Sequence, residues 1–223
     1  MATATAVEVA ALGRAYGERV VLRELAFTLP AGATVAVFGA NGAGKTTLLR
    51  ILAGLLRPHA GEVRVLGAAL PKEAWKVRGR IGLLGHEPLL YRDLTARENL
   101  RFHARLHDVA FTRVDELLEA VGLQSRADDP VHTYSRGMVQ RTAVCRAVLH
   151  EPALLLLDEP LAGLDPGAAG LVAPLIGGGT RVLISHDVEH GLAEADLVLG
   201  LKGGRMAFCE RDVSEADVRA LFT

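Results

Sequence analysis

The chain has 223 residues, of which 50% are hydrophobic and 23% are charged, with a net charge of −1 at neutral pH. This length and composition predict one large domain, or one domain with a sizeable insert, and exclude a disordered tail. A net charge near zero provides no global basic field, so we expect no nucleic-acid partner. The two cysteines, Cys145 and Cys209, are too few for a disulfide scaffold or a four-ligand zinc site, and we expect both to be reduced core thiols.

Neither a secretion signal nor a membrane span is predicted. The first ten residues lack the basic and apolar regions of a signal peptide. Residues 25–44 carry no charge, but Pro30 and several glycines exclude a stable spanning helix. We therefore expect the chain itself to be soluble.

Short strand-like runs open the chain, and a glycine-rich loop interrupts them. A compact apolar strand is expected over 34–38, after a turn at residues 30–32, and a helix ending at Gly54 follows the loop. The other strands expected in this half lie over 7–12, 20–22, 25–29, 62–65 and 80–85.

The segment from about residue 87 to 150 changes to a helical pattern. Thr95 and Glu98 match a capping box, in which each side chain satisfies the other residue's backbone N–H, and they open a helix to about residue 107. A second helix starts at Thr112, and a third runs from Ser135 to His150.

After residue 150, strands and helices alternate again. Continuous apolar strands over 153–157 and 181–185 are typical of a parallel sheet covered on both faces. This order predicts a single α/β domain, residues 1–223, in which a helical subdomain over 87–150 is inserted into a core of residues 1–86 and 151–223.

A phosphate-binding loop is the most specific motif. Residues 39–46 read GANGAGKT and fit G-x-x-x-x-G-K-[ST] without exception, directly between the apolar strand and a helix. That position disfavours a chance glycine-rich turn. The glycines let backbone N–H groups wrap a phosphate chain, and the helix adds the positive end of its dipole. We expect Lys45 to reach the β- and γ-phosphates and the Thr46 hydroxyl to ligate Mg²⁺. The residues expected to hold the nucleotide here are Gly39, Asn41, Gly42, Ala43, Gly44, Lys45, Thr46 and Thr47.

Two acids follow the apolar run over 154–157. Open α/β sheets bind ligands at the carboxyl ends of their strands, so we expect Asp158 to hold the magnesium shell and Glu159 to orient and deprotonate a water. His186 ends the next strand in the same way and is expected to contact the γ-phosphate. The alternative, that these residues only cap strands, is disfavoured because the same chain carries a phosphate loop.

Taken in order, these motifs resemble those of the ATP-binding cassette ATPases of membrane transporters, over nearly the whole chain. Tyr16 resembles the aromatic residue that stacks on adenine in this family. Residues 135–138, Ser-Arg-Gly-Met, resemble the family signature, in which Ser135 and Gly137 would grip the γ-phosphate of the ATP held by the other subunit. Residues 161–165 resemble the loop that crosses the dimer interface. His86 stands where the family has a glutamine that contacts magnesium and relays to the membrane subunit.

The resemblance implies a fold, an activity and partners. The fold would be a P-loop NTPase core of the RecA-like type, with an N-terminal antiparallel β subdomain and the inserted helical subdomain. The activity would be ATP hydrolysis coupled to transport, with ATP and Mg²⁺ bound. Lys45, Glu159 and His186 would be catalytic, and Thr46, Asp158 and His86 would contact the metal. The partners would be a second copy or a paired cassette and integral membrane transporter subunits, which would hold the chain peripherally at the cytoplasmic face of the cell membrane.

A narrower resemblance concerns the transported substrate. Gly85-His86, followed by the sequence LTARENLRF over 94–102, resembles the ATPase subunit of the haem exporter of cytochrome c maturation. The alternative is a generic exporter cassette for drugs, lipids or polysaccharides. A non-transport ATPase acting on ribosomes or DNA is disfavoured, because this chain has one cassette with a short insert. A regulatory module without catalysis is disfavoured by Glu159 and His186.

Two further segments carry expectations. His103 and His107 have the i,i+4 spacing of paired metal ligands, but no HExxH pattern joins them and arginines flank them, so we expect a solvated helix face. The stretch over 86–94 lies at the junction of core and subdomain, where the resemblance implies a groove for a cytoplasmic helix of the membrane subunit. Tyr91 and Arg92 are the expected anchors there; the alternative for the adjacent leucines is that they pack the subdomain hinge.

Overall fold

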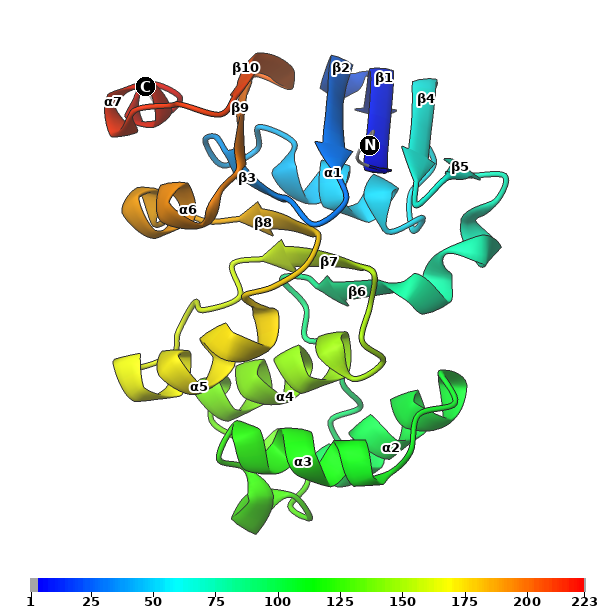
Figure 1. Ribbon diagram of the computed structural model, residues 1–223, viewed down its shortest axis with the longest axis vertical. Coiled ribbons are helices and arrows are strands. Elements are labelled where there is room, and N and C mark those ends of the chain that lie inside the picture. The colour runs from blue at the N-terminus through cyan, green and yellow to red at the C-terminus, as the bar shows by residue number, and fades with distance from the viewer. Residues whose placement is uncertain (1–3, 223) are drawn as a thin grey trace.

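The computed structural model describes residues 4–222, so the first three residues considered for a secretion signal lie outside it. The described chain forms two stacked sheets and a layer of helices (Figure 1). The strands are β1 (Thr5–Tyr16), β2 (Arg19–Pro30), β3 (Thr34–Phe38), β4 (Ala60–Val65), β5 (Ala68–Leu70), β6 (Ile81–Leu84), β7 (Leu154–Asp158), β8 (Arg181–Ile184), β9 (Leu197–Lys202) and β10 (Arg205–Glu210). The α-helices are α1 (Lys45–Leu52), α2 (Ala96–Leu106), α3 (Thr112–Ala120), α4 (Arg136–Val148), α5 (Pro166–Ile176), α6 (Val188–Glu194) and α7 (Glu215–Arg219). Short 3₁₀ turns are η1 (Ala74–Lys76), η2 (Arg78–Arg80), η3 (Gln124–Arg126) and η4 (Val131–Thr133).

The N-terminal sheet is antiparallel. Within residues 4–222 it has four strands in the order β2-β1-β4-β5. The prediction of two separate strands over 20–22 and 25–29 is wrong, because both runs belong to β2. Glu24 turns the backbone locally with φ 50°, and the register against β1 shifts there without ending the pairing.

The second sheet is parallel except at one edge. In the part of the chain that the structure describes, its six strands run in the order β10-β9-β3-β8-β7-β6, and only β10 is antiparallel to its neighbour. Asp158 on β7 pairs with Ile184 on β8, which pairs with Val37 on β3. The register therefore places the phosphate loop, the acidic pair and His186 at one edge of the sheet.

The four leucines of β7 explain why this strand reads as a continuous apolar run. Leu154 and Leu156 face α1 and the antiparallel sheet, whereas Leu155 and Leu157 face the helices α2 to α5. Both faces of the parallel sheet are thus covered, as the apolar run predicts. Full burial stabilises the fold by about 1.5–3 kcal/mol for each such side chain.

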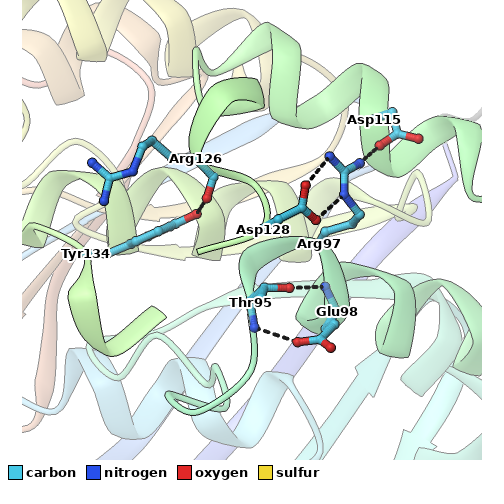
Figure 2. A network of polar contacts seen from close by, with 7 residues as sticks. All are labelled: Thr95, Arg97, Glu98, Asp115, Arg126, Asp128 and Tyr134. Atoms are coloured by element: carbon cyan, nitrogen blue, oxygen red, sulfur yellow. Dashed lines mark hydrogen bonds and ion pairs between the residues drawn. The ribbon is translucent and has the colours of Figure 1, made fainter. Parts of the chain in front are cut away.

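Polar contacts fix the layer of helices that precedes α4 (Figure 2). The capping box of Thr95 and Glu98 is confirmed, with bonds of 3.0 and 2.9 Å between side chains and backbone N–H groups. The Arg97 guanidinium donates to Asp128 at 2.7 and 3.2 Å and pairs with Asp115 on α3. These contacts join α2, α3 and the loop that leads to the start of α4.

We propose that residues 87–150 form the inserted helical subdomain and that the rest of the chain forms the core. In Figure 1 the helices α2, α3 and α4 lie together below the parallel sheet. They share one apolar cluster with Leu155, Leu157 and Leu183 of that sheet. The insert is therefore packed on the core rather than tethered to it.

The cysteines differ in environment. Cys145 on α4 is fully buried, and burial raises the pKa of its thiol to about 12, so it is an inert core residue as expected. Cys209 on the edge strand β10 is also a free thiol, but it is only partly buried and packs at the margin of the core under the antiparallel sheet. Within residues 4–222, no helix is long and apolar enough to cross a membrane.

The prediction of a solvated face for His103 and His107 is wrong. The His107 ring stacks on that of His150, with centroids 4.0 Å apart. His103 is half-buried on the same side of α2, and burial lowers its pKa to about 4. Spacing along one helix could not show that His150, in the turn after α4, covers this face.

Candidate nucleotide site

A cavity of about 630 Å³ opens at the carboxyl edge of the parallel sheet. It gathers most of the residues that the motifs predict. Its lining consists of Tyr16, Arg19, Val21, Asn41, Gly42, Gly44, Lys45, Thr46, Thr47, His86, Asp158, Glu159 and His186. Four predicted residues lie outside this lining: Gly39, Ala43, Ser135 and Gly137.

The two loop residues outside the lining shape the loop from behind. Gly39 follows β3 with φ 153°, and a Cβ there would collide with the carbonyl oxygen of Leu201. Ala43 is buried in the core. Gly44, at φ 105°, precedes α1, and a Cβ would collide with the Leu22 side chain. Only glycine fits at positions 39 and 44, and these two glycines allow the loop to wrap tightly.

The Lys45 side chain folds back into the loop. Its ammonium donates to the carbonyl oxygens of Gly39 at 2.6 Å and Ala40 at 3.2 Å. Burial lowers the pKa of Lys45, and the negative charges of Asp158 and Glu159 oppose that shift. The structure thus holds one cation at the floor of the cavity, facing two carboxyl groups.

Thr46 and Asp158 supply a pair of adjacent oxygens. The Thr46 hydroxyl donates to Asp158 Oδ2 at 3.0 Å. Burial raises the pKa of Asp158, while the Thr46 bond and the nearby His86 and Lys45 oppose that shift. Among residues 4–222, no cluster of three or more His, Cys, Asp or Glu side chains forms a protein-only metal site. Two oxygens fit Mg²⁺, which uses few protein ligands and takes the others from phosphates and water.

Glu159 and His186 lie against each other across the ends of β7 and β8. Glu159 Oε1 is 2.9 Å from His186 Nε2. The backbone of Glu159 is in the left-handed region, with φ 52°, and its N–H donates to the Ile184 carbonyl at 2.9 Å. This backbone conformation is strained for a residue other than glycine, so contacts with the surrounding structure must hold Glu159 in place beside the cavity.

The signature segment lies apart from the cavity of its own chain. Ser135 is the exposed N-cap of α4 and accepts from the Met138 N–H at 3.3 Å. Gly137 approaches the loop over 161–165, because a Cβ there would lie 3.7 Å from the Gly163 carbonyl oxygen. Gln140 on α4 donates to the Pro160 carbonyl at 2.9 Å, so α4 contacts the segment that follows Glu159.

Sequence reasoning missed Arg19 and Val21. The hairpin between β1 and β2 pairs Tyr16 with Arg19, which turns both side chains toward the loop. The Arg19 guanidinium lies over Gly42, 3.5 Å from the position of a Cβ there. Gly17 indicates a turn, from which the pairing of Tyr16 with Arg19 could have been predicted. That pairing places Arg19 as a second cation for a phosphate chain.

A phosphate loop between a parallel strand and a helix, beside a strand-end Asp-Glu pair, defines a P-loop nucleoside triphosphatase. Residues 22–162 match the family model described as ABC transporter, and the chain belongs to this family as an ATP-binding subunit. It is an ATPase of the ABC transporter class, as the motifs predict.

Individual relatives refine this placement. The chain is 41% identical over 211 residues to the daunorubicin resistance ATP-binding protein DrrA3 of Streptomyces coeruleorubidus, covering 91% of this chain and 67% of that protein. It is 34% identical over 209 residues to the Nod factor export ATP-binding protein I of Rhizobium johnstonii, covering 90% of this chain and 67% of that protein. The chain therefore spans about two thirds of the length of both relatives.

A solved structure confirms the fold. A dimeric structure of a post-hydrolysis state of the ATP-binding cassette MJ0796, bound to ADP and Pi, superposes with a TM-score of 0.83 at 25% identity, covering 93% of this chain and 99% of that one. The predicted P-loop core with an antiparallel β sheet and added helices is thus confirmed.

Proposed function

We propose that this chain is the ATP-hydrolysing subunit of an ABC exporter, which dimerises around two ATP molecules and drives a membrane partner. The observation that carries this proposal is the similarity to two relatives named for daunorubicin resistance and Nod factor export. Their names favour the generic exporter of drugs, lipids or polysaccharides over the haem exporter. The haem hypothesis rests on Gly85-His86 and the sequence over 94–102 alone.

The ATP phosphates would lie along the phosphate loop. Lys45 would leave the carbonyls of Gly39 and Ala40 to donate to the β- and γ-phosphates, and Arg19 would add a second positive charge from above. Tyr16, nearly half exposed at the rim, would stack on the adenine. The Arg14 guanidinium lies over one face of this ring, 4.9 Å from its centroid, so adenine would stack on the other face or replace Arg14.

Hydrolysis would be centred on Glu159. Its carboxylate would accept the proton of the attacking water, while His186, 2.9 Å away, would orient that carboxylate and contact the γ-phosphate. Thr46 and Asp158 would hold Mg²⁺, with His86 beside them on the cavity wall. Held by Thr46 and Asp158, the ion would supply positive charge to the phosphates.

A second copy would complete each site. Ser135 and Gly137 are at the start of α4, outside the cavity of their own chain, and would contact the nucleotide of a partner. The exposed N-cap and the first backbone N–H groups of α4 suit a phosphate there. The dimeric state of the MJ0796 cassette supports this arrangement.

The membrane partner would hold the chain at the cytoplasmic face of the cell membrane. Leu89 and Tyr91 are exposed at the junction of core and helices, and the Tyr91 ring packs edge-on against Phe102 at 5.5 Å. Leu90 instead packs into the helical core, as expected for a hinge residue. Tyr91 and Arg92 therefore remain the reporters of docking, and replacing both with Ala should weaken membrane association while ATP binding is kept.

A deletion strain tests the exporter proposal. We expect cells lacking this protein to become more sensitive to a membrane-permeant drug such as daunorubicin, and to regain resistance with the wild-type gene but not with Glu159→Gln. The level of mature cytochrome c should be normal in the deletion strain. Loss of cytochrome c with unchanged drug sensitivity would favour haem export instead.

A further inference from the structure

The segment that joins β5 to β6 carries the most exposed large apolar side chain of residues 4–222. Trp75 is 71% exposed, and it is the only tryptophan of the chain. In Figure 1 this segment, residues 71–80, forms one margin of the molecule. We call it the Trp75 segment. An exposed side chain of this size indicates a surface that binds a partner, because burying the indole releases much apolar area from water.

The core fixes the orientation of the Trp75 segment. Its two turns, η1 and η2, are 3₁₀ turns, in which side chains repeat every three residues. Ala74 and Val77 therefore share one side, and both are buried in the apolar cluster that includes α1. Trp75 and Arg78, one residue further along each turn, share the next side and are exposed. The packing of Ala74 and Val77 thus holds an indole and a guanidinium on the same outward face.

Positive charge predominates on the Trp75 segment. Its exposed cations are Lys72, Lys76, Arg78 and Arg80. Its one carboxylate, Glu73, pairs with Lys76. Among the described residues, no ion pair or side-chain hydrogen bond involves Lys72, Arg78 or Arg80. The chain as a whole has a net charge of −1, so this unpaired positive charge is a local feature of the segment.

Acids on the neighbouring elements do not neutralise these cations. The acids are Glu8, Glu62, Glu87, Asp108 and Glu151. Glu8 faces Arg64 across β1 and β4, and the Glu151 carboxylate is 3.9 Å from Arg113 Nη2. Glu62 precedes Arg64 by two residues on β4, Glu87 lines a hollow together with Arg50, and Asp108 follows His107 at the end of α2. Within residues 4–222, no ion pair joins any of these five acids to the Trp75 segment.

A second apolar side chain extends the exposed face. Leu55 is 62% exposed and follows Gly54, where a Cβ would lie 3.2 Å from the Ala74 Cβ. Leu55 and Trp75 therefore lie next to the same close contact between the end of α1 and η1. Exposed apolar side chains among unpaired cations suit the surface of an anionic membrane, where indole rings lie at the level of the headgroups and Lys and Arg side chains contact lipid phosphates.

We propose that the Trp75 segment binds directly to the surface of an anionic phospholipid bilayer, with the Trp75 indole at the level of the headgroups and the unpaired cations against lipid phosphates. This goes beyond the proposed function, in which a protein partner holds the chain at the membrane, and it rests on that function for placing the chain at the cytoplasmic face. The cytoplasmic leaflet carries anionic lipids that attract Lys and Arg. A protein partner would need a carboxylate placed against each unpaired cation, whereas a bilayer presents phosphates at every position.

The single tryptophan reports on the proposed contact directly. The full chain would be mixed with protein-free liposomes, either of phosphatidylcholine alone or of phosphatidylcholine with phosphatidylglycerol, and Trp75 would be excited where tyrosine does not absorb. With the anionic liposomes we expect a blue shift of the emission, and quenching by phospholipids that carry bromine on the acyl chain near the headgroup. Added salt should weaken this binding, because it screens charges at a surface. Phosphatidylcholine alone should give little or no shift.

Matched variants separate this segment from the rest of the surface. Lys72→Gln/Arg78→Gln should weaken binding to anionic liposomes by about tenfold or more, since each cation near such a surface is worth about fivefold. Trp75→Ala, followed by co-sedimentation, should weaken it by about tenfold. Arg23→Gln/Arg211→Gln removes the same charge elsewhere, from β2 at the opposite edge of the antiparallel sheet from β5 and from the end of β10, and should bind as wild type. All variants should hydrolyse ATP normally, which checks that they are folded.

The proposal is overturned if anionic liposomes leave the Trp75 emission unchanged, if both kinds of liposome bind equally, or if the Arg23/Arg211 control loses as much affinity as Lys72→Gln/Arg78→Gln. A shift with native membranes but not with liposomes of their extracted lipids would also overturn it, in favour of a protein partner. The liposomes contain no membrane subunit, so this test does not depend on the exporter assignment. If the chain binds anionic liposomes but hydrolyses no ATP, the assignment as an exporter motor fails and the lipid contact stands.

Discussion

Replacing Glu159 with Gln isolates the basicity of one side chain. The backbone of Glu159 is held by the Ile184 carbonyl and its carboxylate is 2.9 Å from His186, so an amide of the same size keeps the position and loses the proton acceptor. Removing a general base lowers the rate by about 10²–10⁴, which corresponds to about 3–5 kcal/mol in the activation barrier. ATP affinity should be kept or should rise, because a negative charge beside the phosphates has been removed.

Phosphate release under saturating MgATP, with nucleotide affinity measured by calorimetry, checks this prediction. Glu189→Gln is the matched control, because Glu189 is an exposed residue on α6 outside the cavity lining. Turnover in Glu159→Gln equal to that of the control would refute the assignment of Glu159 as the base. Loss of ATP binding together with turnover would show instead that the carboxylate organises the cavity.

Lys45→Ala should lower both ATP affinity and turnover, because it deletes the cation at the floor of the loop; unchanged affinity by calorimetry would contradict this. Ser135→Arg should bind ATP normally but not hydrolyse it, since Ser135 lies outside its own cavity; failure of this variant to bind ATP would refute the action across the dimer. The free energy of unfolding should fall as the pH drops from about 6.5 to about 4, because His103 and His150 have folded pKa values of about 4, below the ordinary 6.5, and the unfolded chain therefore takes up more protons in this window. His103→Gln/His150→Gln should flatten that slope in urea titrations, and an unchanged slope would contradict the burial of these rings. Cys145 should resist iodoacetamide in the folded protein at neutral pH, because its thiol is buried and its pKa is raised to about 12; rapid alkylation would contradict this.

The phosphate loop and the strand-end acids were predictable because their chemistry is local. Gly39 and Gly44 each need a backbone that only glycine fits, and Asp158 directly ends a run of four buried leucines. Such constraints leave a pattern in adjacent residues, so spacing alone locates them. The order of strands then follows from alternation with helices.

Contacts between distant segments were not predictable in the same way. Arg19 reaches the cavity through a hairpin, and His150 covers His107 from the turn that follows α4, so neither contact leaves a pattern within one segment. The merger of two short runs into β2 was missed because a register shift breaks the alternation at Glu24 without breaking the pairing. In all three cases, contacts between segments that are distant in the sequence determine the structure.

We propose that ATP closes two copies of this chain around the nucleotide. Sedimentation velocity of Glu159→Gln, with and without MgATP, tests this most directly, because hydrolysis cannot reopen the complex. We predict a monomer without nucleotide, a dimer with MgATP, and a monomer under both conditions when Ser135→Arg is added. A monomer in saturating MgATP, or a dimer that Ser135→Arg leaves intact, would contradict the account.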